Sequence, residues 1–293
     1  MWTVRRAMDE FIRALELSET RKAEVIAKHT EVRQALGGEV FLSGSYSRKT
    51  AIAPLHDVDM FAVRGEVDTS SQDIRGANGA VLTPAEVLKQ VRQLLAAKWP
   101  EKELPLLQNH SVHIAFTTKD VEFDVVPAFR VRGRDVFRIP ERETNRWIDS
   151  NPQKHGEQAQ EANRRSGQQL NPLLKAVKQW NREHHSTPLR SFHLEAMSYS
   201  AFPVPPPEQG HLAPLKRLFE HLSRRVQVPC PDPAGLGLDV DANLKPSQRE
   251  AARQVLSSAA EELGRVLAEE LTAPEQAHRR LKKFFGSKYR DHD

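Results

Sequence analysis

Residues 57–63 of this 293-residue chain read DVDMFAV, two carboxylates within an otherwise apolar run. On a β-strand, side chains i and i+2 point to the same face. Val58 and Met60 are therefore expected to enter a core, while Asp57 and Asp59 share the opposite face. An isolated Asp-x-Asp pair also fits an ordinary solvent-facing strand end. The pair therefore predicts a functional site only if a third polar group accompanies it.

That third group is Asp124, in a strongly apolar stretch that reads VEFDVVP over residues 121–127. An acidic side chain in a buried strand needs a partner or a metal ion. By the same alternation, Glu122 and Asp124 are expected on one face and Phe123 and Val125 on the other. Asp124 therefore predicts that the strand contributes to a polar, charge-handling site.

Together, Asp57, Asp59 and Asp124 predict a metal centre. Three carboxylates on neighbouring strands can hold two cations about 3.5–4 Å apart. Hard oxygen ligands suit Mg²⁺, which binds through one or two carboxylates plus substrate phosphates. The prediction is a site with two Mg²⁺ ions, with Mn²⁺ as a substitute. We expect catalysis by positioning and charge stabilisation, and expect Asp124 to assist deprotonation of an attacking hydroxyl.

Gly44 and Ser45 follow a short predicted strand at 39–42 and begin a turn. Glycine allows close approach of the backbone to a phosphate, and successive N–H groups in such a turn can cradle anionic oxygens. Most Gly-Ser pairs are ordinary turns, so this signal has meaning only together with the carboxylates.

The pattern of elements predicts an α+β fold with two parts. Residues 1–150 mix helices and strands in an N-terminal lobe with a mixed sheet. Residues 151–293 form a C-terminal helical lobe, with a cleft between the two; the N-terminal helix can belong to both. The expected helices are 4–36, 83–98, 152–185, 191–201, 210–224, 246–271 and 274–285. The expected strands are 39–42, 58–63, 112–116, 121–126 and 135–138, and strands 112–116 and 121–126 are expected to form a hairpin that turns at 117–120. Residues 65–80 are expected to be a loop.

Composition predicts a soluble, globular protein. The N-terminus lacks the apolar core of a signal peptide, so a cytoplasmic location is expected. Hydrophobic residues make up 39% of the chain, and no stretch approaches the roughly 18 apolar residues of a membrane span. A single cysteine, Cys230, excludes an internal disulfide. The net charge of +4 suits an anionic ligand such as a nucleoside triphosphate and does not by itself indicate a polynucleotide. The basic residues over 279–290 are explained by a solvated helix face, with polynucleotide contact as the alternative.

The motifs GSYSRKT (44–50), DVD (57–59) and DVVPAF (124–129) resemble those of the bacterial CD-NTase family, relatives of cyclic GMP-AMP synthase and oligoadenylate synthase within the polymerase-β superfamily. The resemblance extends to 147–155, to 173–181, to 191–195 and to Asp232-Pro233, and so covers about residues 39–245. Lys49 departs from the pattern, because many relatives have glycine there.

The resemblance implies that residues 1–150 are a nucleotidyltransferase lobe of the polymerase-β type. It also implies further site residues. Ser45 would contact the triphosphate of the donor nucleotide, and Lys178 and Ser191 would hold the same triphosphate from the helical lobe. Without the family, Lys178 is an exposed helical lysine and Ser191 a helix N-cap. Tyr199 would stack on a base, although a core aromatic explains it as well.

By resemblance, the chain joins nucleoside triphosphates, ATP among them, into a cyclic di- or trinucleotide second messenger in antiphage defence. A downstream effector and a regulatory protein are the implied partners; neither a membrane nor a polynucleotide is expected. Three alternatives stay open. They are a polymer-directed transferase of the tRNA-end or poly(A) type, a linear oligoadenylate synthase, and a nucleotide-binding protein without activity, against which the three mutually repelling aspartates argue.

Overall fold

The computed structural model describes residues 1–55, 57–70, 73–76, 79–116, 121–184 and 189–292. The chain forms two compact units. One is mainly helical and contains residues 1–17, 49–54 and 157–293, and the other contains the sheet and residues 18–48 and 55–156. The predicted division at residue 150 and the predicted cleft stay predictions. In the structure, two early segments of the chain group with the helical unit.

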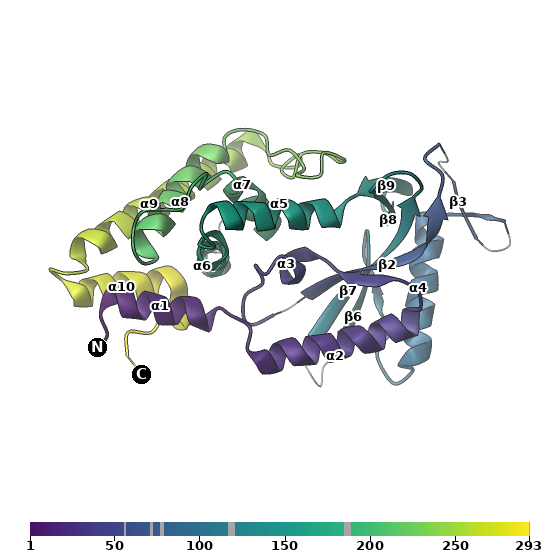
Figure 1. The fold of residues 1–293 in the computed structure, drawn as a ribbon, viewed down its shortest axis with the longest axis horizontal. Coiled ribbons are helices and arrows are strands. Elements are labelled where there is room, and N and C mark those ends of the chain that lie inside the picture. Colours follow the sequence, from purple (N-terminus) through teal and green to yellow (C-terminus); the bar gives the residue numbers. More distant parts are fainter. Residues whose placement is uncertain (56, 71–72, 77–78, 117–120, 185–188, 293) are drawn as a thin grey trace. The chain divides into compact units, whose positions relative to one another are not determined.

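The sheet unit is built around a mixed sheet (Figure 1), seven-stranded over the described residues. The strand order is β1-β2-β7-β6-β5, and β8 pairs with β7 and with β9. The β2–β7 pair is parallel, whereas β1–β2, β5–β6, β6–β7, β7–β8 and β8–β9 are antiparallel. This confirms the predicted α+β class with a mixed sheet. The strands are β1 (Val40–Leu42), β2 (Asp57–Val67), β5 (Leu106–Leu107), β6 (Val112–Phe116), β7 (Val121–Val131), β8 (Phe137–Glu141) and β9 (Arg146–Ser150).

Alternation along β2 and β7 separates core from polar face as predicted. Val58, Met60, Phe123 and Val125 are all fully buried. The two helices α2 (Glu19–Leu36) and α4 (Pro84–Lys98) pack against each other and against β7. Helix α4 begins at the predicted place because Thr83 and Glu86 form a capping box, in which each side chain accepts from the other residue's backbone N–H.

The predicted N-terminal helix over 4–36 is wrong in one respect, because two helices replace it. Helix α1 (Val4–Ala14) ends before Leu15, and α2 begins after Ser18, whose hydroxyl accepts from Arg21 N at 3.1 Å. A serine N-cap satisfies one of the orphan donors of a new helix and so allows the chain to restart in another direction. The break lies where the chain passes from one unit to the other, between residues 17 and 18.

Three further expectations are corrected. The predicted loop over 65–80 holds the end of β2 and the short strand β3 (Ile74–Arg75), which pairs antiparallel with β4 (Val81–Leu82) directly after that segment. Strand β9 follows Pro140, after which no strand was expected, and is held by pairing with β8. The predicted helix 152–185 divides into two at Gly167 and Gln168, both with positive φ. The predicted hairpin turn at 117–120 lies outside the described residues.

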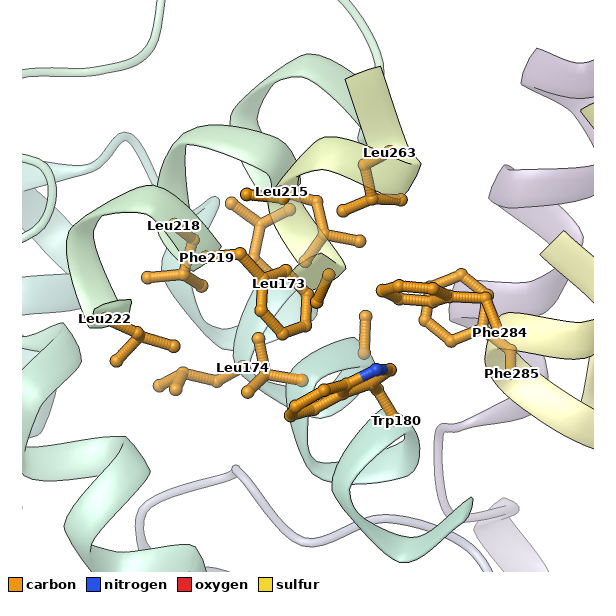
Figure 2. Close-up of a cluster of buried hydrophobic side chains, with 14 of the residues drawn as sticks. Leu173, Leu174, Trp180, Leu215, Leu218, Phe219, Leu222, Leu263, Phe284 and Phe285 are labelled. Atoms are coloured by element: carbon orange, nitrogen blue, oxygen red, sulfur yellow. The ribbon is translucent and has the colours of Figure 1, made fainter. Parts of the chain in front are cut away.

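The helical unit has its own hydrophobic core, part of which Figure 2 shows. Trp180, Phe219, Phe284 and Phe285 are 5% exposed or less and pack with a set of leucines. Trp180 meets Phe219 edge to face, with ring centroids 4.9 Å apart. The helices are α5 (Pro152–Arg165, which begins in the sheet unit), α6 (Leu170–Glu183), α7 (Ser191–Ser198), α8 (Leu212–Arg225), α9 (Pro246–Glu269) and α10 (Pro274–Phe285).

Among the described residues, the structure contains no helix whose length and apolar character would let it cross a membrane.

Candidate functional site

Parallel pairing of β2 with β7 brings the three predicted aspartates together. Asp59 lies opposite Asp124 in the register, and Asp57 lies opposite Glu122. All four residues alternate with fully buried neighbours, so their carboxylates share the polar face of the sheet. Asp57 is exposed, whereas Asp59 and Asp124 are half-buried. The arrangement concentrates negative charge on two adjacent strands.

This concentration of negative charge makes the ionised forms of Asp59 and Asp124 less favourable. Burial raises the pKa of Asp59 above its ordinary value; the charges of Asp124 and Asp57 raise it further, and the Arg48 guanidinium opposes them. Burial also raises the pKa of Asp124, against hydrogen bonds from His113 and Gln108. Carboxylates whose charged form is disfavoured by burial and by one another are stabilised by a nearby cation.

The donor set fits a divalent ion of the Mg²⁺ type. It offers carboxylate oxygens from neighbouring strand positions, and hard divalent cations bind through such oxygens. Among the residues that the structure describes, the positive charge near Asp59 and Asp124 does not offset their burial, since the pKa of each is raised. The residues present therefore fit the ion that the sequence predicts.

Gly44 is shaped by its contact with Asp59. It opens the short helix α3 (Gly44–Ser47) with a φ of 63°, and a Cβ on this residue would lie 1.7 Å from Asp59 Oδ2. Ser43 N also donates to Asp59 O at 2.8 Å. The backbone at residue 44 can lie against the Asp59 carboxylate only because glycine has no side chain. Ser45, the next residue, is half-buried in α3.

A histidine that the sequence did not single out completes the polar face. His113 on β6 lies opposite Asp124 in the register, and its Nδ1 is 2.9 Å from Asp124 Oδ1. Its Nε2 lies 3.6 Å from Glu122 Oε2. Ligand atoms of Asp57, His113 and Glu122 all lie within 4.8 Å of one another. The site therefore offers one nitrogen as well as several oxygens.

In the helical unit, Lys178 is buried in a polar network. It is 5% exposed, and its Nζ donates to Glu195 Oε2 at 2.8 Å and to both Thr50 O and Thr50 Oγ1 at 3.0 Å. Glu195 is fully buried and also accepts from the Thr50 hydroxyl at 3.0 Å. Thr50 belongs to the segment 49–54, which connects the Gly44-Ser45 turn to the Asp57-Asp59 strand. The Lys178–Glu195 pair thus anchors that connection to helices α6 and α7.

Ser191 and Tyr199 mark the two ends of α7. Ser191 is exposed and is the first helical residue, while Arg190 takes the N-cap position without a side-chain hydrogen bond. Tyr199 is the C-cap residue, packs against the helical core, and donates its hydroxyl to Glu195 Oε1 at 3.3 Å. Tyr199 therefore shares a buried carboxylate with Lys178.

A large groove of about 850 Å³ lies elsewhere in the helical unit, among α6, α9 and α10. Its lining includes Trp180, Arg265, Arg279 and Lys283 and none of the predicted site residues. Two of these basic residues belong to the C-terminal cluster over 279–290.

Comparison with known proteins supplies the family. The sequence model described as "Second Messenger Oligonucleotide or Dinucleotide Synthetase domain" (SMODS) matches residues 1–163, more than half of the chain. The chain belongs to the SMODS family of CD-NTases. This confirms the family predicted from the motifs and, with it, a nucleotidyltransferase.

Relatives of this CD-NTase include a probable cyclic nucleotide synthase of Bacillus cereus (strain VD146), 25% identical over 70% of this chain and 68% of the relative. A cyclic AMP-AMP-AMP synthase of Acinetobacter sp. is 27% identical over 63% of this chain, and the match spans only 54% of that relative. The structure resembles E. coli CdnC in complex with ATP and with a HORMA protein, with TM-scores of 0.72 and 0.73, 15% identity and 98% of each chain covered. At that identity the structures show the fold alone.

Our first prediction for this CD-NTase concerns the effect of the Asp59 carboxylate on the stability of the fold at different pH values. Because the pKa of Asp59 is raised in the fold, the unfolded chain loses this proton at lower pH than the folded chain does. Stability therefore falls as pH rises from about 4, the ordinary carboxyl pKa, through the raised value. In metal-free buffer at pH 7, Asp59→Asn should be more stable than wild type by about 0.5–2 kcal/mol, and the difference should vanish at acid pH.

Denaturant titrations at several pH values measure this difference. Asp68→Asn, at an exposed surface pair with Arg132, is the control and should change stability by less than about 0.5 kcal/mol. Mg²⁺ should raise the melting temperature of wild type more than that of Asp59→Asn. A variant less stable than wild type at pH 7 would contradict the argument.

The second prediction concerns Gly44. Gly44→Ala forces the Asp59 carboxylate to move and should lower nucleotide-transfer activity by roughly 10²-fold or more, since a displacement of about 1 Å can have that effect. Gly133→Ala is the matched control, because Gly133 also has a positive φ, of 74°, but has open space around its Cβ position. Equal loss of activity in the two variants would mean that backbone strain alone explains the effect.

The third prediction concerns Lys178. Lys178→Met leaves Glu195 buried without its cation and should destabilise the chain by about 3–5 kcal/mol. Adding Glu195→Leu should recover part of that loss. Lys175→Met, on the same helix and equally buried, is the control; its partner Glu16 is 45% exposed and stays hydrated, so the cost should be smaller. Urea unfolding of the single and double variants tests the coupling.

Proposed function

We propose that this CD-NTase joins nucleoside triphosphates, ATP among them, into a cyclic di- or trinucleotide and releases pyrophosphate. The observation that carries the proposal is the register of β2 and β7, which aligns Asp59 with Asp124. Asp57 lies two residues before Asp59 on β2, on the same face of the sheet. Membership of a family described by oligonucleotide and dinucleotide synthesis supports the same reaction. The names of the two curated relatives, both cyclic nucleotide synthases, support it further.

Asp57, Asp59 and Asp124 act in this proposal as the ligands of two Mg²⁺ ions. When bound, the ions supply the positive charge that offsets the triphosphate and the leaving pyrophosphate. The chain's own contribution is to hold three carboxylates rigidly on paired strands, so that little reorganisation is needed during the reaction. In this proposal Asp124, which accepts a hydrogen bond from His113, takes the proton of the attacking hydroxyl.

Ser45, Lys178 and Ser191 bind the donor triphosphate in this proposal. Ser45 follows Gly44 directly, so the contact that fixes Gly44 against Asp59 also fixes the position of Ser45. Ser191 lies exposed at the start of α7. Lys178 Nζ donates to Thr50 O and Glu195 Oε2, and in this proposal it would exchange part of that network for phosphate oxygens when the nucleotide binds. Tyr199 is assigned to the base of the nucleotide.

The proposed setting is antiphage signalling, in which an effector senses the product. One structural neighbour, E. coli CdnC, was solved in complex with a HORMA protein, which supports a regulatory protein as partner here too. The proposed location is the cytoplasm, where the nucleoside triphosphates are.

The test is a product assay. Purified protein is incubated with all four labelled nucleoside triphosphates and Mg²⁺ or Mn²⁺, and the products are treated with phosphatase and analysed by mass spectrometry. We expect a phosphatase-resistant product without free ends, absent from the Asp57→Ala/Asp59→Ala double variant. Its mass gives the bases and the ring size, and nuclease digestion separates 2′–5′ from 3′–5′ linkages.

Other outcomes identify the alternatives. A phosphatase-sensitive ladder would indicate a linear oligonucleotide synthase. Incorporation only after addition of RNA, with binding that weakens steeply as salt rises, would indicate a polymer-directed transferase. Binding of nucleotide without product, with or without a HORMA-type partner and in either metal, would contradict the proposal and favour a protein without activity.

A further inference from the structure

His113 is oriented by Asp124. A carboxylate only accepts hydrogen bonds, so the 2.9 Å contact between His113 Nδ1 and Asp124 Oδ1 assigns the proton of the ring to Nδ1. In the neutral ring, Nε2 then carries a lone pair. A histidine whose one nitrogen donates to a carboxylate while the other binds a metal is the usual arrangement around protein metal ions.

The lone pair of Nε2 faces negative charge. Glu122 Oε2 lies 3.6 Å away, and a ligand atom of Asp57 lies within 4.8 Å of both. Electron-rich groups at these separations are stabilised by a cation between them. His113 and Glu122 are 18% and 40% exposed, so an ion from solvent can reach them.

The separations match the ligand spacing of a small divalent ion. With ligand distances of roughly 2.0–2.2 Å, two ligands of a tetrahedral ion lie about 3.4 Å apart. The observed 3.6 Å between Nε2 and Oε2 is close to that value. One nitrogen and two carboxylates form a mixed set, unlike the all-oxygen set of Asp59 and Asp124.

We propose that His113, Glu122 and Asp57 form a third cation position, selective for a divalent transition metal over Mg²⁺. Imidazole nitrogen suits transition metals, whereas Mg²⁺ prefers oxygen ligands and gives up its waters reluctantly. The inference deepens the proposed function and rests on it in one respect. Asp57 is a ligand of this third cation position and also one of the three carboxylates that the proposed function assigns to the Mg²⁺ ions. Occupancy of this position then adjusts how Asp57 is held for the transfer reaction.

The test detects the nitrogen directly and needs no turnover. Mn²⁺ is added to the metal-free protein in the presence of excess Mg²⁺, and electron spin-echo spectroscopy records the coupling of bound Mn²⁺ to ¹⁴N. Wild type should show the coupling, and selective ¹⁵N labelling of histidine should change it. His113→Gln, which can still donate to Asp124, should lose the coupling and bind Mn²⁺ at least roughly tenfold more weakly at this position.

Two matched variants complete the design. His110→Gln, on the neighbouring segment where its Nδ1 contacts Pro140 O at 2.8 Å, should keep the coupling. Glu122→Gln should weaken it while circular dichroism shows an intact fold, which keeps the proposal testable if His113→Gln misfolds. Asp59→Asn should keep the coupling yet lose product formation, so failure of this inference and failure of the proposed function give different results. Absence of ¹⁴N coupling in wild type, or its persistence in His113→Gln, would overturn the proposal.

Discussion

The parallel pairing of β2 with β7 is the interaction on which the sheet unit depends. Its register places Asp59 opposite Asp124 and Asp57 opposite Glu122, and the buried residues between them fix which face the carboxylates occupy. The pairing would be easier to form if the acidic residues were neutral, because burial and mutual repulsion raise the pKa of both Asp59 and Asp124. The apolar alternation of both strands supplies the stabilisation that holds these charges together. The packing of the sheet therefore offsets the unfavourable free energy of holding these charged carboxylates close together.

Sequence patterns predicted this centre because its residues obey a period of two. The apolar residues beside Asp57, Asp59 and Asp124 identified both strands and the face on which the carboxylates lie, and the structure agrees. His113 could have been found in the same way. Strands β6 and β7 pair antiparallel with Phe116 opposite Val121, and counting outward from that pair puts His113 opposite Asp124. The parallel register of β2 with β7 had no such local signal, because the two strands are about sixty residues apart and tertiary packing alone sets their alignment.

Other features were beyond pattern reading for physical reasons. The interruption between α1 and α2 depends on a single serine cap within a sequence that keeps helical spacing on both sides. Strand β9 has only five residues, with adjacent Trp147 and Ile148 in place of a regular alternation, and it pairs along β8. The burial of Lys178 was not visible either, since a helical lysine is usually exposed and only the position of Glu195 on another helix explains its place.

The route of the chain between the two units has a consequence for how such a protein can be taken apart. The backbone passes from one unit to the other between residues 17 and 18, 48 and 49, 54 and 55, and 156 and 157. Neither unit is therefore a continuous piece of the polypeptide. A single cut in the gene would release no complete unit, and a chimera that exchanges the helical unit with that of a relative would need matched junctions at all of these points.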